Sequence, residues 1–277
     1  MTDQPRGPIT DMHNEFTQKK LDVLAALTEA YKGAWTHLGE MVRLIWLPVV
    51  LSILVSTIAF MQPTENNKLL LLALQAVSFF LSAIISVAWY RFILLNEKPT
   101  GSYQIHFGAR EGRYLIVFLA LLLLVLPLFL TAPQFPPGAA LQDYMKTAGL
   151  AASLVGFFGL LIVFVGLYFF ARLYLLLPAM AIDEPINVRL VLERTRGNFW
   201  RIVLLSLLSN LPVIIAYGFI ILVSGIVNLP DVIAYILQAL VTVFFNIVSI
   251  AVFAIAYREL IGPKGAMAAD LDRPDTI

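Results

Sequence analysis

Few residues in this sequence combine the types and spacing that catalysis or metal binding requires. The three histidines, His13, His37 and His106, are far apart, and none belongs to a paired-histidine pattern that binds zinc. Asp183 and Glu184 are adjacent carboxylates that could bind a cation or act as a general base. They precede a predicted helix, however, where acidic side chains ordinarily favour the positive end of the helix dipole. We therefore expect no catalytic, metal-binding or cofactor-binding residues, and no enzyme activity.

Other reactive signatures are missing from the sequence. The chain has no cysteine, which excludes disulfides, thiolate metal sites and cysteine nucleophiles. It contains no P-loop, dinucleotide-binding fingerprint or nucleophile elbow. The sequence therefore predicts a non-catalytic protein that needs no cofactor and binds no nucleic acid.

Neutral polar side chains recur inside the apolar segments and form the most suggestive pattern. Ser78, Ser82 and Ser86 follow one another at four-residue steps, which places them on one face of a helix. In a membrane such a face usually mediates helix packing, but it can instead line a polar path or a cleft for lipid head groups. The candidate residues of this polar intramembrane face are Gln75, Ser78, Ser82, Asn210, Gln238 and Asn246.

Long apolar stretches must position these polar residues. The chain is 60% hydrophobic and 13% charged, whereas a typical soluble domain has about 25% charged residues. Stretches of about 20 apolar residues are long enough to cross about 30 Å of hydrocarbon as helices. We expect such helices at 44–61, 69–90, 114–130, 147–170, 202–225 and 232–256, and the fourth is predicted to continue to Leu177, where Pro178 ends it.

Positive charge is distributed unevenly among the connecting segments. The N-terminal region, the segments 91–113 and 172–201 and the C-terminal region hold 17 of the 19 Lys and Arg residues. The opposite side holds only Lys68 and Lys146. By the positive-inside rule, this asymmetry places both termini in the cytoplasm. We expect a cytoplasmic region over 1–40, a six-helix transmembrane domain over 41–260 and a flexible cytoplasmic tail over 261–277.

An internal repeat is predicted from the spacing of glycines and prolines. Gly33, Gly112 and Gly197 are each followed, fifteen residues later, by a proline inside an odd-numbered span. We infer three parallel two-helix repeats at about 33–98, 99–184 and 185–260. Chance coincidence of Gly and Pro, which are frequent in membrane helices, is the alternative.

Each repeat is predicted to begin with a cytoplasmic amphipathic helix. One amphipathic pattern precedes the first span, and another follows Pro185. The middle copy, at 102–113, is shorter and weaker. These helices either bind anionic lipid head groups or a protein partner, or only cover the end of the bundle. The first has an apolar stripe of Leu21, Leu24, Tyr31, Trp35 and Leu38. The arginines that we expect to contact head groups or a partner are Arg91, Arg172, Arg196, Arg201 and Arg258.

Four segments, 87–97, 172–179, 195–201 and 256–260, carry a resemblance to a known family. Over most of the chain from Gly33 to Leu260, the sequence resembles poorly characterised six-span bacterial inner-membrane proteins of the YciC-like group. It is also similar to the membrane region of some glycerophosphodiester phosphodiesterases. The resemblance implies an all-α polytopic protein in the bacterial cytoplasmic membrane and implies no particular reaction.

Two functions remain open from the sequence. Uncharged spans, basic amphipathic segments and the missing reactive cluster favour an accessory subunit or scaffold of a membrane complex, with a protein partner and anionic lipids on the cytoplasmic side. The alternative is a carrier or binder of lipid or an apolar solute. That alternative predicts that the polar faces containing Gln75, Asn210, Gln238 and Asn246 converge on a shared cavity.

Overall fold

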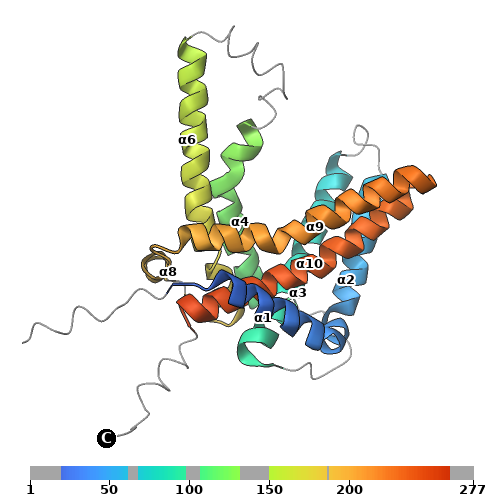
Figure 1. The fold of residues 1–277 in the computed structure, drawn as a ribbon, viewed down its shortest axis with the longest axis horizontal. Coiled ribbons are helices and arrows are strands. Elements are labelled where there is room, and N and C mark those ends of the chain that lie inside the picture. The colour runs from blue at the N-terminus through green and yellow to red at the C-terminus, as the bar shows by residue number, and fades with distance from the viewer. Residues whose placement is uncertain (1–19, 62–67, 98–106, 132–149, 186, 263–277) are drawn as a thin grey trace, which may run out of the picture.

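The computed structural model describes residues 20–61, 68–97, 107–131, 150–185 and 187–262 of the chain. Within these ranges every regular element is a helix (Figure 1). The helices are α1 (Val23–Thr36), α2 (Leu38–Met61), α3 (Lys68–Leu95), α4 (Ala109–Thr131), α6 (Leu150–Leu173), α7 (Leu176–Ala181), α8 (Val188–Arg194), α9 (Phe199–Val227) and α10 (Asp231–Leu260).

The long helices pack in pairs. α2 packs against α3, α4 against α6, and α9 against α10, so each pair forms a hairpin. The three hairpins diverge from a common end, where α1, α7 and α8 lie, and the α4–α6 hairpin points away from the other two (Figure 1). We call this common end the base. Five of the predicted apolar stretches fall wholly inside a helix, and the fourth overlaps α6 from Leu150 onward.

Four of these helices are long and apolar enough to span a membrane. They are residues Val42–Met61 of α2, together with α3, α9 and α10. Phe158–Leu173 of α6 form a shorter apolar helix. The predicted all-helical class is therefore confirmed for the described residues, and the four long apolar helices support the prediction of a membrane protein.

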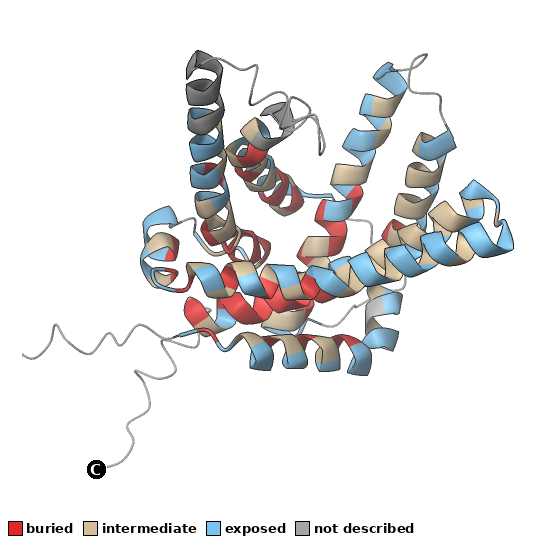
Figure 2. Cartoon of the chain, turned by 45° about the horizontal axis from the view of Figure 1, so that its top comes forward, coloured by how far each residue is buried: buried red, intermediate tan, exposed pale blue. Residues whose placement is uncertain are grey.

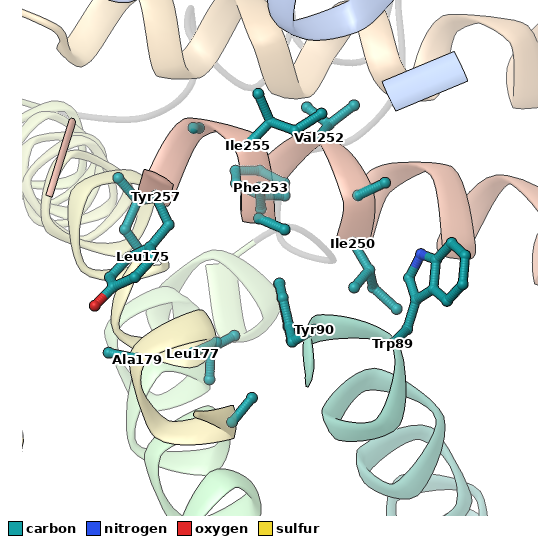
Figure 3. Close-up of a cluster of buried hydrophobic side chains, with 14 of the residues drawn as sticks. Trp89, Tyr90, Leu175, Leu177, Ala179, Ile250, Val252, Phe253, Ile255 and Tyr257 are labelled. Carbon is teal, nitrogen blue, oxygen red and sulfur yellow. The ribbon is translucent and has the colours of Figure 1, made fainter. Parts of the chain in front are cut away.

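The base contains the hydrophobic core. Buried residues gather where the hairpins meet, and exposed residues predominate toward the hairpin ends (Figure 2). Trp89 and Tyr90 of α3 pack there with Leu175, Leu177 and the segment of α10 from Ile250 to Tyr257 (Figure 3). The Trp89 indole N–H also donates to the backbone carbonyl of Ile247 at 3.0 Å. α10 is the central helix, since half of its most apolar stretch is buried, whereas none of the equivalent stretch of α9 is.

α1 packs against α10 and α9 through small residues. Ala26, Ala30 and Ala34, at four-residue steps, are its buried positions. Small side chains allow two helices to approach closely. Of the predicted apolar stripe, Leu24 and Trp35 are each 71% exposed and do not contribute to this contact. Large apolar side chains thus cover the outside of α1, and alanines form its contact with the core.

The chain is interrupted where the fourth apolar stretch was expected to continue. α6 ends at Leu173, and α7 starts a new helix at Leu176 that includes Pro178. Pro178 is the third residue of α7, where no backbone N–H is required by the preceding turn. Proline therefore lies inside α7 and does not end α6.

The predicted amphipathic segments differ from one another. The first is α1, separate from α2, and the third is the seven-residue α8. Residues 102–106 of the middle segment lie outside the described part, and 109–113 form the first turn of α4. The three glycines also differ, because Gly33 and Gly112 are helical, whereas Gly197 has a left-handed φ of 78° in the turn before α9. Pro48, Pro127 and Pro212 lie inside α2, α4 and α9.

Candidate functional site

A polar cavity of about 560 Å³ lies between the hairpins. Its walls come from α2, α3, α4 and α10, with single residues from α9 and from the segment before α7. One face of each of three helices lines it. That face carries serines four residues apart in α2 and α3, and other polar residues in α10. The polar residues that line it are Ser52, Ser56, Ser78, Ser82, Ser86, Tyr114, Tyr174, Tyr217, Tyr235, Gln238, Thr242, Asn246 and Ser249.

The lining carries no formal charge. Among the described residues around the cavity there is no Asp, Glu, Lys, Arg or His. The remaining lining residues are apolar, including Phe79 and Phe118. The cavity therefore offers hydroxyl and amide groups between apolar surfaces.

Several of these polar groups are already hydrogen-bonded, and others are not. The Ser78 hydroxyl donates to the Leu74 carbonyl at 3.0 Å, and the Thr242 hydroxyl donates to the Gln238 carbonyl at 2.8 Å. The Ser52 hydroxyl has no hydrogen-bond partner in the described structure. The side-chain amides of Gln238 and Asn246 likewise form no hydrogen bond with any described group. The cavity thus retains unused capacity for hydrogen bonds to water or a ligand.

Aromatic side chains lie at the end of the cavity nearest the base. Tyr114 and Tyr174 line it there, and Tyr90 lies beside Tyr114 in the core, with their ring centroids 6.3 Å apart. Tyr90 is fully buried, and its hydroxyl has no hydrogen-bond partner within the described ranges. An aromatic layer therefore separates the cavity from the outer surface of the base.

At the opposite end the cavity continues toward the turn between α9 and α10. A second pocket, of about 530 Å³, shares Tyr235 and Gln238 with it and reaches Asn228 and Asp231. Tyr235 stacks on Phe60 of α2, with ring centroids 4.3 Å apart. We call this end, away from the base, the mouth of the cavity.

The structure brings together some of the predicted polar residues and separates others. Ser78, Ser82, Gln238 and Asn246 line the cavity. Gln75 is exposed and is not among its lining residues. Asn210 is also not among the lining residues. Its side-chain amide donates to the Ser206 carbonyl of its own helix at 2.8 Å.

Several polar residues that line the cavity were not predicted from the sequence. Ser52 and Ser56 show the same four-residue step as the serines of α3, and this spacing was the available signal. The four tyrosines gave no such signal, because tyrosine is common at membrane interfaces and in helix packing. Their convergence on one cavity follows only from the packing of α4, α9 and α10 around the turn that carries Tyr174.

Most of the arginines proposed as head-group or partner contacts also join parts of the base. Arg201 donates to the Leu21 carbonyl at 2.7 Å, and Arg258 donates to Glu29 at 2.8 Å. Both contacts attach α1 and the residue before it to the C-terminal hairpin. Arg196 is exposed.

Arg172 is buried and interacts with neutral acceptors. Its side chain is paired with the Thr195 hydroxyl at 2.9 Å, the Tyr168 hydroxyl at 2.6 Å and the Leu192 carbonyl. The residue is only 7% exposed. These contacts join the end of α6 to α8, because α8 and the turn after it supply Leu192 and Thr195.

Asp183 is the centre of an ionic cluster on the base. Its carboxylate accepts hydrogen bonds from Arg91 at 3.1 Å, Arg110 at 2.8 Å and Arg113 at 2.8 Å. Arg91 also pairs with Glu97. Asp183 has a left-handed φ of 60°, a conformation that aspartate tolerates better than most residues. The cluster joins α3 and α4 to the segment after α7.

The expected role of the two carboxylates at a helix N-terminus was wrong. Asn187 caps α8, and its side chain accepts a hydrogen bond from the Leu190 backbone N–H at 2.9 Å. Glu184 instead accepts a hydrogen bond from the Tyr257 hydroxyl of α10. The carboxylates thus connect helices across the base.

The described residues contain no group of three or more His, Asp or Glu side chains placed to hold a metal ion. No protein-family model, no curated protein and no solved structure matches this chain.

Proposed function

We propose that this protein binds a lipid, or another largely apolar molecule that carries a polar group, and acts as its carrier or binder. The observation that supports this function is the uncharged polar cavity between the hairpins, with Gln238 and Asn246 available for hydrogen bonds. Its volume of about 560 Å³ is within the range of roughly 300–1,000 Å³ that is common for small-molecule sites. A polar group in a membrane span is costly unless it is hydrogen-bonded, so these amides require water or a ligand.

The topology that we propose has six spans. α4 and α6 complete the set with the four helices that meet the length and hydropathy criteria. The uneven distribution of Lys and Arg supports a cytoplasmic base and cytoplasmic termini. The aromatic layer then closes the cavity toward the cytoplasm, and the mouth faces the other side of a bacterial inner membrane.

We also propose that the three hairpins are copies of one unit. The supporting observations are their common attachment to the base and the position of Pro48, Pro127 and Pro212 inside the first helix of each. Arg172 further joins the second hairpin to α8, and Arg258 joins the third to α1. Each of these contacts connects the end of one unit to the short helix of another.

The lipid-binding function is tested by extraction in polymer discs followed by native mass spectrometry of bound lipids. We expect Gln238→Leu and Asn246→Leu to lose a lipid species that the unaltered protein retains. Asn210→Leu is the matched control, because Asn210 is a polar residue of a spanning helix that lies outside the cavity lining. Identical lipid retention by all four proteins would contradict the proposal.

The second candidate is the accessory subunit or scaffold predicted from the sequence. The specific observation in its favour is α9, whose most apolar stretch has no buried residue. Membrane lipid covers such a face equally well, so this function ranks below lipid binding. The same extraction separates the two, because a stoichiometric protein partner with no cavity-dependent lipid would favour the subunit.

A further inference from the structure

We propose that the cavity selects lipids whose head group is uncharged and carries hydroxyl groups. The inference rests on the lipid-binding function proposed above and specifies the class of ligand. It follows from three features of the cavity: the charge of its walls, the charge at its mouth and the hydrogen-bonding groups that remain available.

The walls provide no counter-charge for an anionic head group. The described lining contains no ionisable side chain other than tyrosine. A phosphate that entered would lose hydration without gaining an ion pair, which is strongly unfavourable in an apolar surrounding. Arg113 precedes the lining residue Tyr114 in sequence, but its guanidinium donates to Asp183 at 2.8 Å. Arg91, Arg110 and Arg113 are thus engaged in the ionic cluster around Asp183.

The mouth disfavours anions further. Asp231 lines the second pocket, which shares Tyr235 and Gln238 with the cavity. It is the one charged side chain among the described residues of that pocket. A head group that enters from this side passes a carboxylate, and a negative charge on the head group is repelled.

The available hydrogen-bonding groups match hydroxyls. The amides of Gln238 and Asn246 each offer two N–H donors and a carbonyl acceptor. A hydroxyl group both donates and accepts, so a head group with several hydroxyls can satisfy both kinds of site. A phosphate diester only accepts and would leave the amide carbonyls without a donor.

The test compares lipids with identical acyl chains in phosphatidylcholine nanodiscs. Monoglucosyl diacylglycerol and phosphatidylglycerol both carry hydroxyls, and only the second is anionic, while phosphatidylethanolamine adds an amine. Native mass spectrometry measures how much of each stays bound after release from the disc. We expect at least tenfold higher retention of the glucosyl lipid than of either phospholipid, and loss of this preference in Gln238→Leu.

A charged variant tests the electrostatic argument directly. Ser82 lines the cavity from α3, and Ser82→Lys places a cation in it. We expect this variant to retain phosphatidylglycerol at least tenfold better than the unaltered protein does. Ser82→Gln, which is long but neutral, should keep the original preference.

The outcomes separate failure of the inference from failure of the proposed function. Equal or stronger retention of a phospholipid that Gln238→Leu abolishes would overturn the head-group inference while supporting a lipid-binding cavity. An unchanged preference in Ser82→Lys would also overturn it. If Gln238→Leu alters the retention of none of these lipids, the lipid-binding function itself fails.

Discussion

The two ends of α10 have different surroundings. From Ile247 to Tyr257 nearly every side chain is buried against α1, α3 and α7. From Asp231 to Asn246 no described side chain reaches that degree of burial, and the polar ones line the cavity. One continuous helix thus supports a packed base at one end and a cavity wall at the other.

Several polar groups of the base are bonded across helices, although the buried Tyr90 hydroxyl has no partner among the described residues. At the base, the Trp89 indole and the Arg172 guanidinium have hydrogen-bond partners from other helices or turns. Around the cavity, Ser52 and the amides of Gln238 and Asn246 have none among the described groups. Hydrogen-bonded polar groups hold the helices in one arrangement, whereas polar groups without a protein partner can bind water or a ligand. We infer that the base determines stability and that the cavity contributes little to it.

The largest expected effect of breaking the base is that of Trp89→Ala. Trp89 is 1% exposed and bonded to α10, so its removal leaves a large void and deletes a hydrogen bond between α3 and α10. We expect a loss of about 3–5 kcal/mol in the free energy of unfolding, or failure to accumulate in the membrane. Thermal unfolding in detergent measures this effect. Trp35→Ala is the control, because Trp35 is 71% exposed and should change stability little. Equal losses from the two variants would show that the base is not the stabilising region.

Replacing Arg172 should have the next largest effect. Arg172→Met keeps the length of the side chain but leaves the Leu192 carbonyl and the Tyr168 hydroxyl without this donor. Hydrogen bonds to a charged group contribute about 1.5–3 kcal/mol, so we expect a loss of about 2 kcal/mol. The matched control is Arg189→Met, since the Arg189 side chain is 89% exposed. Unfolding in detergent again provides the measurement, and a stable Arg172→Met protein would mean that α8 is held without this residue.

The effect of Asp183→Asn should be smaller and dependent on salt. Asparagine tolerates the left-handed conformation but removes the charge that attracts Arg91, Arg110 and Arg113. Because the Asp183 side chain is 35% exposed, we expect a loss of only about 1 kcal/mol at low salt. The difference from the unaltered protein should shrink at high salt, since screening already weakens the ion pairs. Glu193→Gln breaks an exposed pair with Arg189 and serves as the control. A loss that does not vary with salt would assign Asp183 a role in backbone conformation instead.

The sequence was informative about the helices and less so about the site. Apolar length predicted the long helices, because the hydrocarbon requirement is a local property of each segment. Four-residue spacing placed Ser78 and Ser82 on one face, and that face lines the cavity. The same spacing could not distinguish Gln75, which is exposed, because helix rotation and the partner helix decide which part of a polar face is covered.

Interactions across the base were beyond the reach of sequence periodicity. Asp183 meets arginines 70 to 92 residues away, and the pairing depends on how α3 and α4 pack beside α7. Arg172 and Arg258 were expected to face lipid head groups, but they bind segments of the same chain. An arginine at the end of a membrane helix looks the same in the sequence whether it contacts lipid head groups or another segment of its own chain.

The smallest expected effect is the sharpest test of the contrast between base and cavity. Ser209 is fully buried outside the cavity lining, and its hydroxyl donates to the Ser206 carbonyl at 2.9 Å, so Ser209→Ala should cost about 0.5–1.5 kcal/mol. Ser52 is a cavity residue whose hydroxyl has no protein partner in the described structure, so Ser52→Ala should leave the free energy of unfolding unchanged or slightly raise it. Both values come from thermal unfolding in delipidated detergent. If Ser52→Ala becomes destabilising only after lipid is added back, the Ser52 hydroxyl takes part in ligand binding. If Ser52→Ala lowers the free energy of unfolding as much as Ser209→Ala does in the absence of lipid, then ordered water already forms a hydrogen bond with the Ser52 hydroxyl.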